Sequence, residues 1–149
     1  MVGKYEVGYT IDNTSKTRAL FEINKGVGKH KGIDINVNSR VKEEMRRVPF
    51  KNMIYIADGP SDIPAFSLVN KNGGATFAIY PKRELQAFQQ VEKMRKDGRI
   101  NMYAEADYTE GTTAHMWITN KINEFAERIR EDEREKLTDS ISGIPKHIP

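Results

Sequence analysis

The length and composition of the chain limit what it can be. At 149 residues it is long enough for one domain with a sizeable core, and its net charge of +3 is small. It contains no cysteine, which excludes disulfide bonds, thiolate nucleophiles and cysteine-ligated zinc. No apolar run approaches the roughly 20 residues of a membrane span, and no signal-peptide pattern is present. We therefore expect a cytoplasmic protein without a membrane segment.

The first part of the chain predicts a strand followed by a helix. Residues 5–10 alternate apolar and polar side chains, as a half-buried strand does. A turn with several capping side chains follows, and apolar residues at helical spacing then predict a helix from Ser15 that ends at Gly26. The residues of this helix expected to face the core are Ala19, Leu20 and Ile23.

Lys16 stands in the first turn of this helix, where the helix dipole disfavours a positive charge. A phosphate bound at the helix start would remove the conflict, so Lys16 is a candidate phosphate-binding residue. Lys25, at the other end of the helix, is the second candidate. The alternative is that Lys16 is an ordinary exposed lysine at a helix end.

Basic residues gather in the region that follows. Residues 26–32 are rich in glycine and lysine, but Lys29 is followed by His30, so the Walker P-loop pattern is not met. No aromatic residue interleaves with the basic residues from Lys25 to Arg47, which gives base stacking little support. We expect a solvated basic surface here, with a phosphate-facing surface as the alternative, and no nucleic-acid partner.

The stretch from Asn52 to Pro64 is the centre of the chain. Residues 53–56 form a short apolar run with β-branched and aromatic side chains, as in a strand buried on both faces. Asp58 follows this strand directly, and Asp62 lies where the next helix begins. Two carboxylates at the carboxyl end of a strand suit a hard cation that bridges to a phosphate. The alternative is a plain strand-to-helix loop with a capping aspartate.

Strands and helices alternate through the rest of the chain. Helices are predicted at residues 63–70, at about residues 83–96 and after Gly111, and strands at residues 75–80 and 100–106. In the second of these helices we expect Leu85, Phe88, Val91 and Met94 to face inward. In the last helix the residues expected to form a core-facing stripe are Trp117, Ile118, Ile122, Phe125 and Ile129.

This alternation predicts the fold class. We expect an α/β fold, a partial Rossmann-like arrangement of three layers, with a mainly parallel sheet of about three central strands and a short N-terminal strand. The domain is expected to span residues 1–137. Residues 138–149 are short, polar and proline-containing, and we expect them to form a flexible tail.

The segment from Ala57 to Asp62, Ala-Asp-Gly-Pro-Ser-Asp, resembles the fourth motif of the haloacid dehalogenase-like (HAD) phosphohydrolases, often written GDxxxD. The run of residues 46–56 before it is similar to the phosphoserine-phosphatase-like branch of that family. Residues 15–26 are similar to the segment that carries the third-motif lysine of the family. One departure is that Ala57 stands at the glycine of the family pattern, where a methyl group can crowd a ligand.

This resemblance implies a fold, an activity and a set of site residues. The chain would form the C-terminal half of a HAD-like core domain. The family hydrolyses phosphate monoesters through an aspartyl-phosphate and requires Mg²⁺, so the substrate would be a phosphorylated small molecule. By resemblance, Lys16 and Gly59 would bind the phosphate, with Lys16 stabilising it during catalysis. Asp58 and Asp62 would be the metal ligands.

The nucleophile of the family is missing from this chain. In the family it is the first aspartate of an Asp-x-Asp motif, and no two aspartates here are two residues apart. The resemblance therefore implies that the chain binds Mg²⁺ weakly and is inactive alone.

The strand that carries the nucleophile would also be missing, which leaves residues 54–57 with an unpaired edge. We expect either a homo-oligomer or association with a missing N-terminal half. The alternative function is a non-catalytic HAD-derived module for oligomerisation or for binding a phosphoryl ligand.

Overall fold

The computed structural model describes residues 10–29, 32 and 34–143. The chain divides into two units, Met1–Ala106 and Asp107–Pro149. The strand predicted at residues 5–10 falls outside the described residues except for Thr10, so it stays a prediction.

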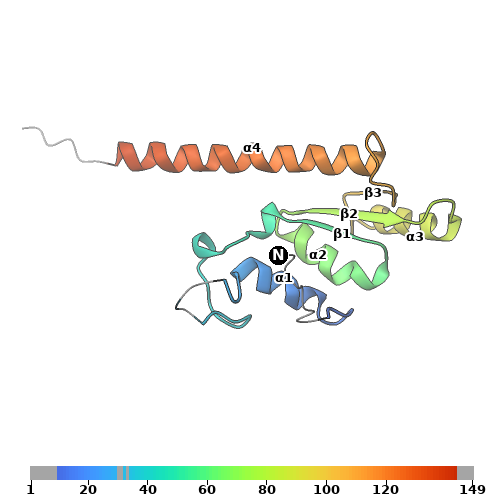
Figure 1. Cartoon of the computed structure of the whole chain (residues 1–149), viewed down its shortest axis with the longest axis horizontal. Coiled ribbons are helices and arrows are strands. Elements are labelled where there is room, and N and C mark those ends of the chain that lie inside the picture. The colour runs from blue at the N-terminus through green and yellow to red at the C-terminus, as the bar shows by residue number, and fades with distance from the viewer. Residues whose placement is uncertain (1–9, 30–31, 33, 144–149) are drawn as a thin grey trace, which may run out of the picture. The chain divides into compact units, whose positions relative to one another are not determined.

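The described part of the first unit contains a parallel sheet of three strands (Figure 1). Its strands are β1 (Ile54–Ala57), β2 (Ala75–Tyr80) and β3 (Met102–Glu105), side by side in that order. Both neighbouring pairs run parallel, with Ala57 opposite Ala78 and Ala78 opposite Tyr103. The mixed α/β class and the parallel sheet of three strands are thus confirmed.

Two helices connect these strands and cover one face of the sheet. They are α2 (Ile63–Lys71) and α3 (Leu85–Lys96). Phe66 of α2 and Val91 of α3 are fully buried in one cluster with Ala78 of β2. Because the described helices of this unit pack on one face, the three-layer arrangement stays a prediction.

Helix α1 (Lys16–Lys25) packs beside α2 and ends at Gly26, which adopts the left-handed conformation with φ 70° as predicted. Leu20 is buried in a second cluster with Phe50, Met53, Ala65 and Val69. Ile23, expected in the core, is instead 52% exposed, whereas Asn24 is buried. The buried residues Leu20 and Asn24 are four positions apart on one face of the helix. Ile23 stands about 100° around the helix axis from Asn24, at the exposed border of that face.

The buried face of α3 is narrower than predicted. Val91 and Met94 are buried, but Leu85 is 68% exposed, so its predicted core position is wrong. Leu85 stands in the first turn, ahead of the part of the helix that packs on the sheet. Phe88 lies at the border, where its ring packs edge-on against Tyr80 at a centroid distance of 5.6 Å.

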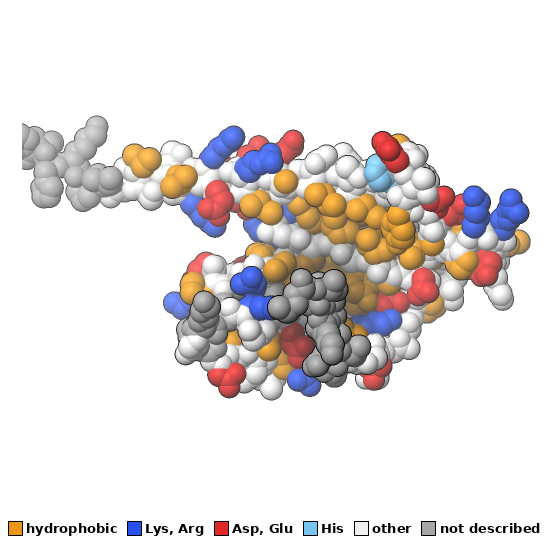
Figure 2. Space-filling model, viewed as in Figure 1, with side chains coloured by type: hydrophobic (Ala, Val, Ile, Leu, Met, Phe, Trp, Pro, Cys, Tyr) orange, Lys and Arg blue, Asp and Glu red, His pale blue; other side chains and the backbone are white. Residues whose placement is uncertain are grey.

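The second unit contains one long helix, α4 (Thr113–Ser142), capped by the Thr112 hydroxyl, which accepts a hydrogen bond from the His115 N–H. Ile122 and Ile129 are exposed rather than part of a core, and Figure 2 shows hydrophobic side chains among charged ones along this helix. The helix continues into residues 138–142, where a tail was expected, and residues 144–149 lie outside the described residues. None of the described helices is both long and apolar enough to cross a membrane.

Candidate functional site

The loop after β1 turns one aspartate inward and leaves the other outside. Asp58 follows the strand and is exposed, and Gly59 continues in extended conformation with φ −162°. A short 3-10 turn, Pro60–Asp62, then leads into α2, and the Asp62 N–H donates to the Gly59 carbonyl at 3.0 Å. The turn carries the Asp62 side chain back under the end of the strand, where Asp62 is 2% exposed.

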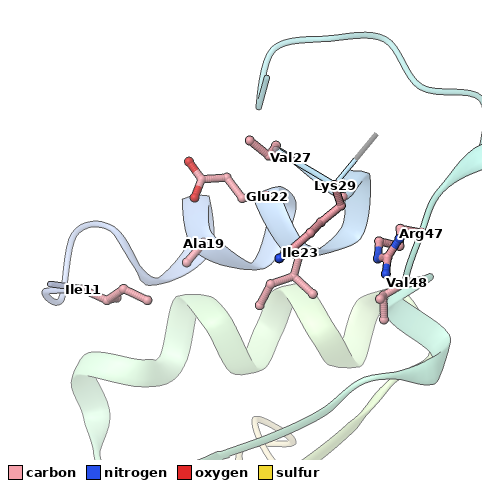
Figure 3. Close-up of a pocket in the computed structure, with 9 residues that line it drawn as sticks. Ile11, Ala19, Glu22, Ile23, Val27, Lys29, Arg47 and Val48 are labelled. Carbon is pink, nitrogen blue, oxygen red and sulfur yellow. The ribbon is translucent and has the colours of Figure 1, made fainter. Parts of the chain in front are cut away.

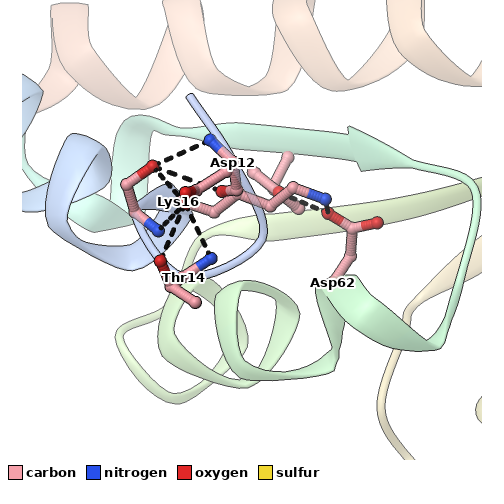
Figure 4. Close-up of polar contacts among 6 residues, drawn as sticks. Asp12, Thr14, Lys16 and Asp62 are labelled. Carbon is pink, nitrogen blue, oxygen red and sulfur yellow. Dashed lines mark hydrogen bonds and ion pairs between the residues drawn. The ribbon is translucent and has the colours of Figure 1, made fainter. Parts of the chain in front are cut away.

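Lys16 reaches this buried carboxylate from the start of α1. Its Nζ lies 2.7 Å from Asp62 Oδ1, although the two residues are 46 positions apart in the sequence (Figure 4). The Lys16 side chain keeps 24% of its surface exposed. The structure therefore brings together two of the predicted site residues, and the lysine is not simply turned to solvent.

Tyr55 of β1 is a third member of this group that sequence reasoning missed. Its hydroxyl donates a hydrogen bond to the same oxygen, Asp62 Oδ1, at 2.7 Å. Its ring packs edge-on against Phe66 at 5.2 Å. Burial raises the pKa of the Tyr55 phenol, and the hydrogen bond to Asp62 acts in the same direction. The strand was expected to be buried on both faces, but all four residues of β1 are half-buried. A tyrosine in such an otherwise aliphatic strand is itself a signal, since its hydroxyl needs a partner.

The turn before α1 fixes the direction of Lys16. The Asp12 carboxylate accepts hydrogen bonds from the N–H and hydroxyl groups of both Thr14 and Ser15, at 2.8 to 3.0 Å (Figure 4). Hydrogen bonds from the Thr14 and Ser15 side chains, followed by those from their N–H groups, lower the pKa of Asp12 to about 2. These hydrogen bonds hold residues 12–15 in one conformation, and the first turn of α1, with Lys16, follows directly from them.

The two aspartates supply only part of a metal site. Among the described residues no three His, Cys, Asp or Glu side chains are grouped so as to hold a metal ion. The two hydrogen bonds that Asp62 accepts from described side chains both go to Oδ1, and among these residues none bonds Oδ2, which could face a cation or a water bound to it. Mg²⁺ requires near-octahedral oxygen coordination. The carboxylates of Asp58 and Asp62 are the right type of ligand for Mg²⁺, but two residues are too few to complete its coordination.

The other predicted positions are placed as follows. No atom lies within 4 Å of where a side chain on Gly59 would begin, so space is open in front of the loop. The Ala57 side chain packs against the cluster that contains Phe66 and Val91, beneath the sheet. Lys25, the second candidate lysine, donates to the Val37 carbonyl at the opposite end of α1 from Lys16.

The outer edge of β1 faces a hollow. Among the described strands only β2 pairs with β1. Helix α1 runs antiparallel to β1, because Lys16 at its start reaches Asp62 whereas Asn24 near its end donates to the carbonyl of Val48, before the strand. Between the helix and the strand lies a hollow of about 510 Å³. Its lining residues are Ile11, Lys16, Ala19, Leu20, Ile23, Ile54, Tyr55 and Ile56.

Comparisons with known proteins give one curated relative. No family model matches the chain, and no solved structure matches it. A protein of Borreliella burgdorferi that is described as uncharacterized is 41% identical over 119 residues, which cover 78% of this chain. The match covers 38% of the relative, so the chain spans well under half the length of that protein.

Proposed function

We propose that this chain is the C-terminal portion of a Mg²⁺-dependent HAD-type phosphohydrolase and is inactive alone because it lacks the nucleophilic aspartate. The observation that carries the proposal is the 2.7 Å contact between Lys16 Nζ and Asp62 Oδ1. It joins a cation and a carboxylate at the carboxyl end of a parallel strand, the edge at which open α/β sheets bind ligands.

Each of the site residues has a distinct role in this proposal. The Lys16 ammonium neutralises the charge of the bound phosphate, which a positioned cation does best where water is partly excluded. Asp62 holds that ammonium in place and Tyr55 in turn holds Asp62, since Asp62 Oδ1 accepts hydrogen bonds from the Lys16 ammonium and the Tyr55 hydroxyl. Gly59 leaves room for the phosphate at the loop.

Asp58 and Asp62 would hold Mg²⁺, which when bound polarises a phosphoryl oxygen. The remaining ligands would come from the substrate phosphate and from the nucleophilic carboxylate on other polypeptide. The relative from Borreliella burgdorferi supports this division, because the matched region makes up only 38% of that longer chain.

Thermal unfolding in the presence of MgCl₂ tests the metal role. We expect millimolar Mg²⁺ to raise the melting temperature of the native chain, because a ligand that binds only the folded state stabilises it. Asp58→Asn should abolish this response. The control is Asp97→Asn, which removes an aspartate that is paired with Lys93 on α3. An equal response to Mg²⁺ in the native chain and Asp58→Asn would refute the metal role of Asp58.

A second candidate function, a non-catalytic module for oligomerisation, is favoured by the outer edge of β1, which pairs with none of the described strands. An edge strand with a hollow beside it is a template for pairing with another chain. Sedimentation velocity at micromolar concentration should then show dimers or larger species. A single monomeric species would exclude self-association under those conditions and leave the first candidate unaffected.

A further inference from the structure

A second hollow lies beside α1 and shares Ile11, Ala19 and Ile23 with the hollow next to β1 (Figure 3). Its volume is about 340 Å³, within the range of small-molecule sites in proteins. Five aliphatic side chains line it: Ile11, Ala19, Ile23, Val27 and Val48. Ile11 and Ile23 are each 52% exposed, so the hollow presents apolar surface to solvent. Water in such a place is replaced favourably by an apolar group.

The charged residues of this hollow favour an anion. Lys29 and Arg47 line it, and neither is in an ion pair with any described residue. Glu22, the one carboxylate among the described lining residues, is already paired with Arg18 at 3.0 Å. The net charge offered to a ligand is therefore positive.

Lys29 and Arg47 approach the hollow from different segments of the chain. Lys29 follows the C-terminus of α1, where the helix dipole favours a cation. Arg47 lies in an irregular segment and is not at the end of an α-helix. In Figure 3 Arg47 lies at the end of the hollow next to Val48, with Ile11 at the other end. The hollow thus has aliphatic walls, with Arg47 at one end and the Lys29 side chain alongside Ile23.

We infer that this hollow binds a small amphipathic carboxylate, with its aliphatic chain against Ile23 and Val27 and its carboxylate beside Arg47. The ligand class follows from the two halves of the site, since an aliphatic chain matches the walls and a single anionic head matches the cationic end. The site is separate from Lys16 and Asp62, so the inference does not rest on the proposed function.

Titration of the full chain with sodium decanoate, below its micelle-forming concentration, tests the inference by calorimetry. We expect saturable binding of one molecule per chain. Decanol should bind at least about tenfold more weakly and decyltrimethylammonium not measurably, because only the carboxylate pairs with Arg47. Equal affinities for decanoate and decyltrimethylammonium, or no binding of decanoate, would overturn the inference.

Variants locate the binding. Arg47→Glu should weaken decanoate binding at least about tenfold, and the matched charge reversal at exposed Arg40, outside the lining, should leave it unchanged. Ile23→Asp should abolish binding, and Leu85→Asp, at an exposed leucine of α3 outside the lining, should not. Equal effects of Arg47→Glu and Arg40→Glu would overturn the inference. So would a native dimer that Ile23→Asp converts to monomer, since a second copy would then cover the hollow.

Discussion

Lys16 Nζ and Asp62 Oδ1 lie 2.7 Å apart, the same separation as Lys93 Nζ and Asp97 Oδ2 on the surface of α3. The two pairs differ in exposure. The Asp62 side chain is 2% exposed, whereas Lys93 and Asp97 are 76% and 47% exposed. Equal distances therefore have unequal consequences, because a buried carboxylate without its cation is left with an uncompensated charge.

Lys16→Met should lower the free energy of unfolding by about 2 to 3 kcal/mol, since a partly buried cation partner is lost. Urea titration followed by circular dichroism measures the change. The matched variant Lys93→Met should change stability by less than about 0.5 kcal/mol, as exposed ion pairs contribute little.

Asp62→Asn completes a double-mutant cycle with this lysine. In the Asp62→Asn background, Lys16→Met should lower the free energy of unfolding clearly less than in the native chain, because no buried carboxylate is then left without a cation partner. Additive costs of the two changes would show that the two side chains do not interact in solution.

Tyr55→Phe should destabilise the chain by about 1 to 2 kcal/mol, since it removes one donor from a buried charged oxygen and leaves the ring packed on Phe66. The control is Tyr108→Phe, at a tyrosine that is 51% exposed. Both variants are compared by chemical denaturation. Equal effects of the two changes would mean that the hydroxyl of Tyr55 does not stabilise Asp62.

Periodicity and turn chemistry predicted the elements of the sheet well. The strand predicted at residues 75–80 coincides with β2, and Gly26 ends α1 as predicted. Individual core positions were less predictable, because a pattern places residues on a helix face without saying which neighbour covers it. Ile23 was therefore expected in the core but is exposed. The buried residue is instead its neighbour Asn24, whose amide donates to the Val48 carbonyl at 2.8 Å.

The site could be predicted only one residue at a time. The helix dipole singled out Lys16, and the loop between the strand and the next helix singled out Asp58 and Asp62. Their contact spans 46 positions and depends on α1 running antiparallel to β1, which no local pattern encodes. Tyr55 was missed because its strand reads as a simple apolar run.

Gly74→Ala should destabilise the chain by about 3 kcal/mol, because a methyl group there has no space. The added carbon would lie 2.4 Å from the Phe50 carbonyl oxygen and 2.9 Å from that of Met53, and backbone atoms cannot move aside cheaply. Gly59→Ala is the control, since a methyl group at residue 59 meets no atom within 4 Å. Thermal melts should show a large loss for the first variant and little change for the second. Equal losses would contradict the close packing at Gly74.

Asp12 should make the stability of the chain depend on pH in acid. Hydrogen bonds from Thr14 and Ser15 lower its pKa from 3.8 in the unfolded chain to about 2 in the folded state. The folded state therefore binds the proton less readily, and the stabilising contribution is fully present above about pH 4. It is lost as the pH falls toward about 2. Melting temperatures of the native chain and of Asp12→Ala, measured between about pH 5 and about pH 2, should thus converge as the pH falls.

Other acidic groups titrate in the same range but do not obscure this comparison. Glu92, whose pKa is lowered to about 2 by hydrogen bonds from Arg95 and Tyr103, is present in both proteins and cancels from their difference. A constant difference in melting temperature across the whole range would mean that the Asp12 carboxylate does not hold the turn. The start of α1 would then need another anchor, and so would the direction of Lys16 toward Asp62.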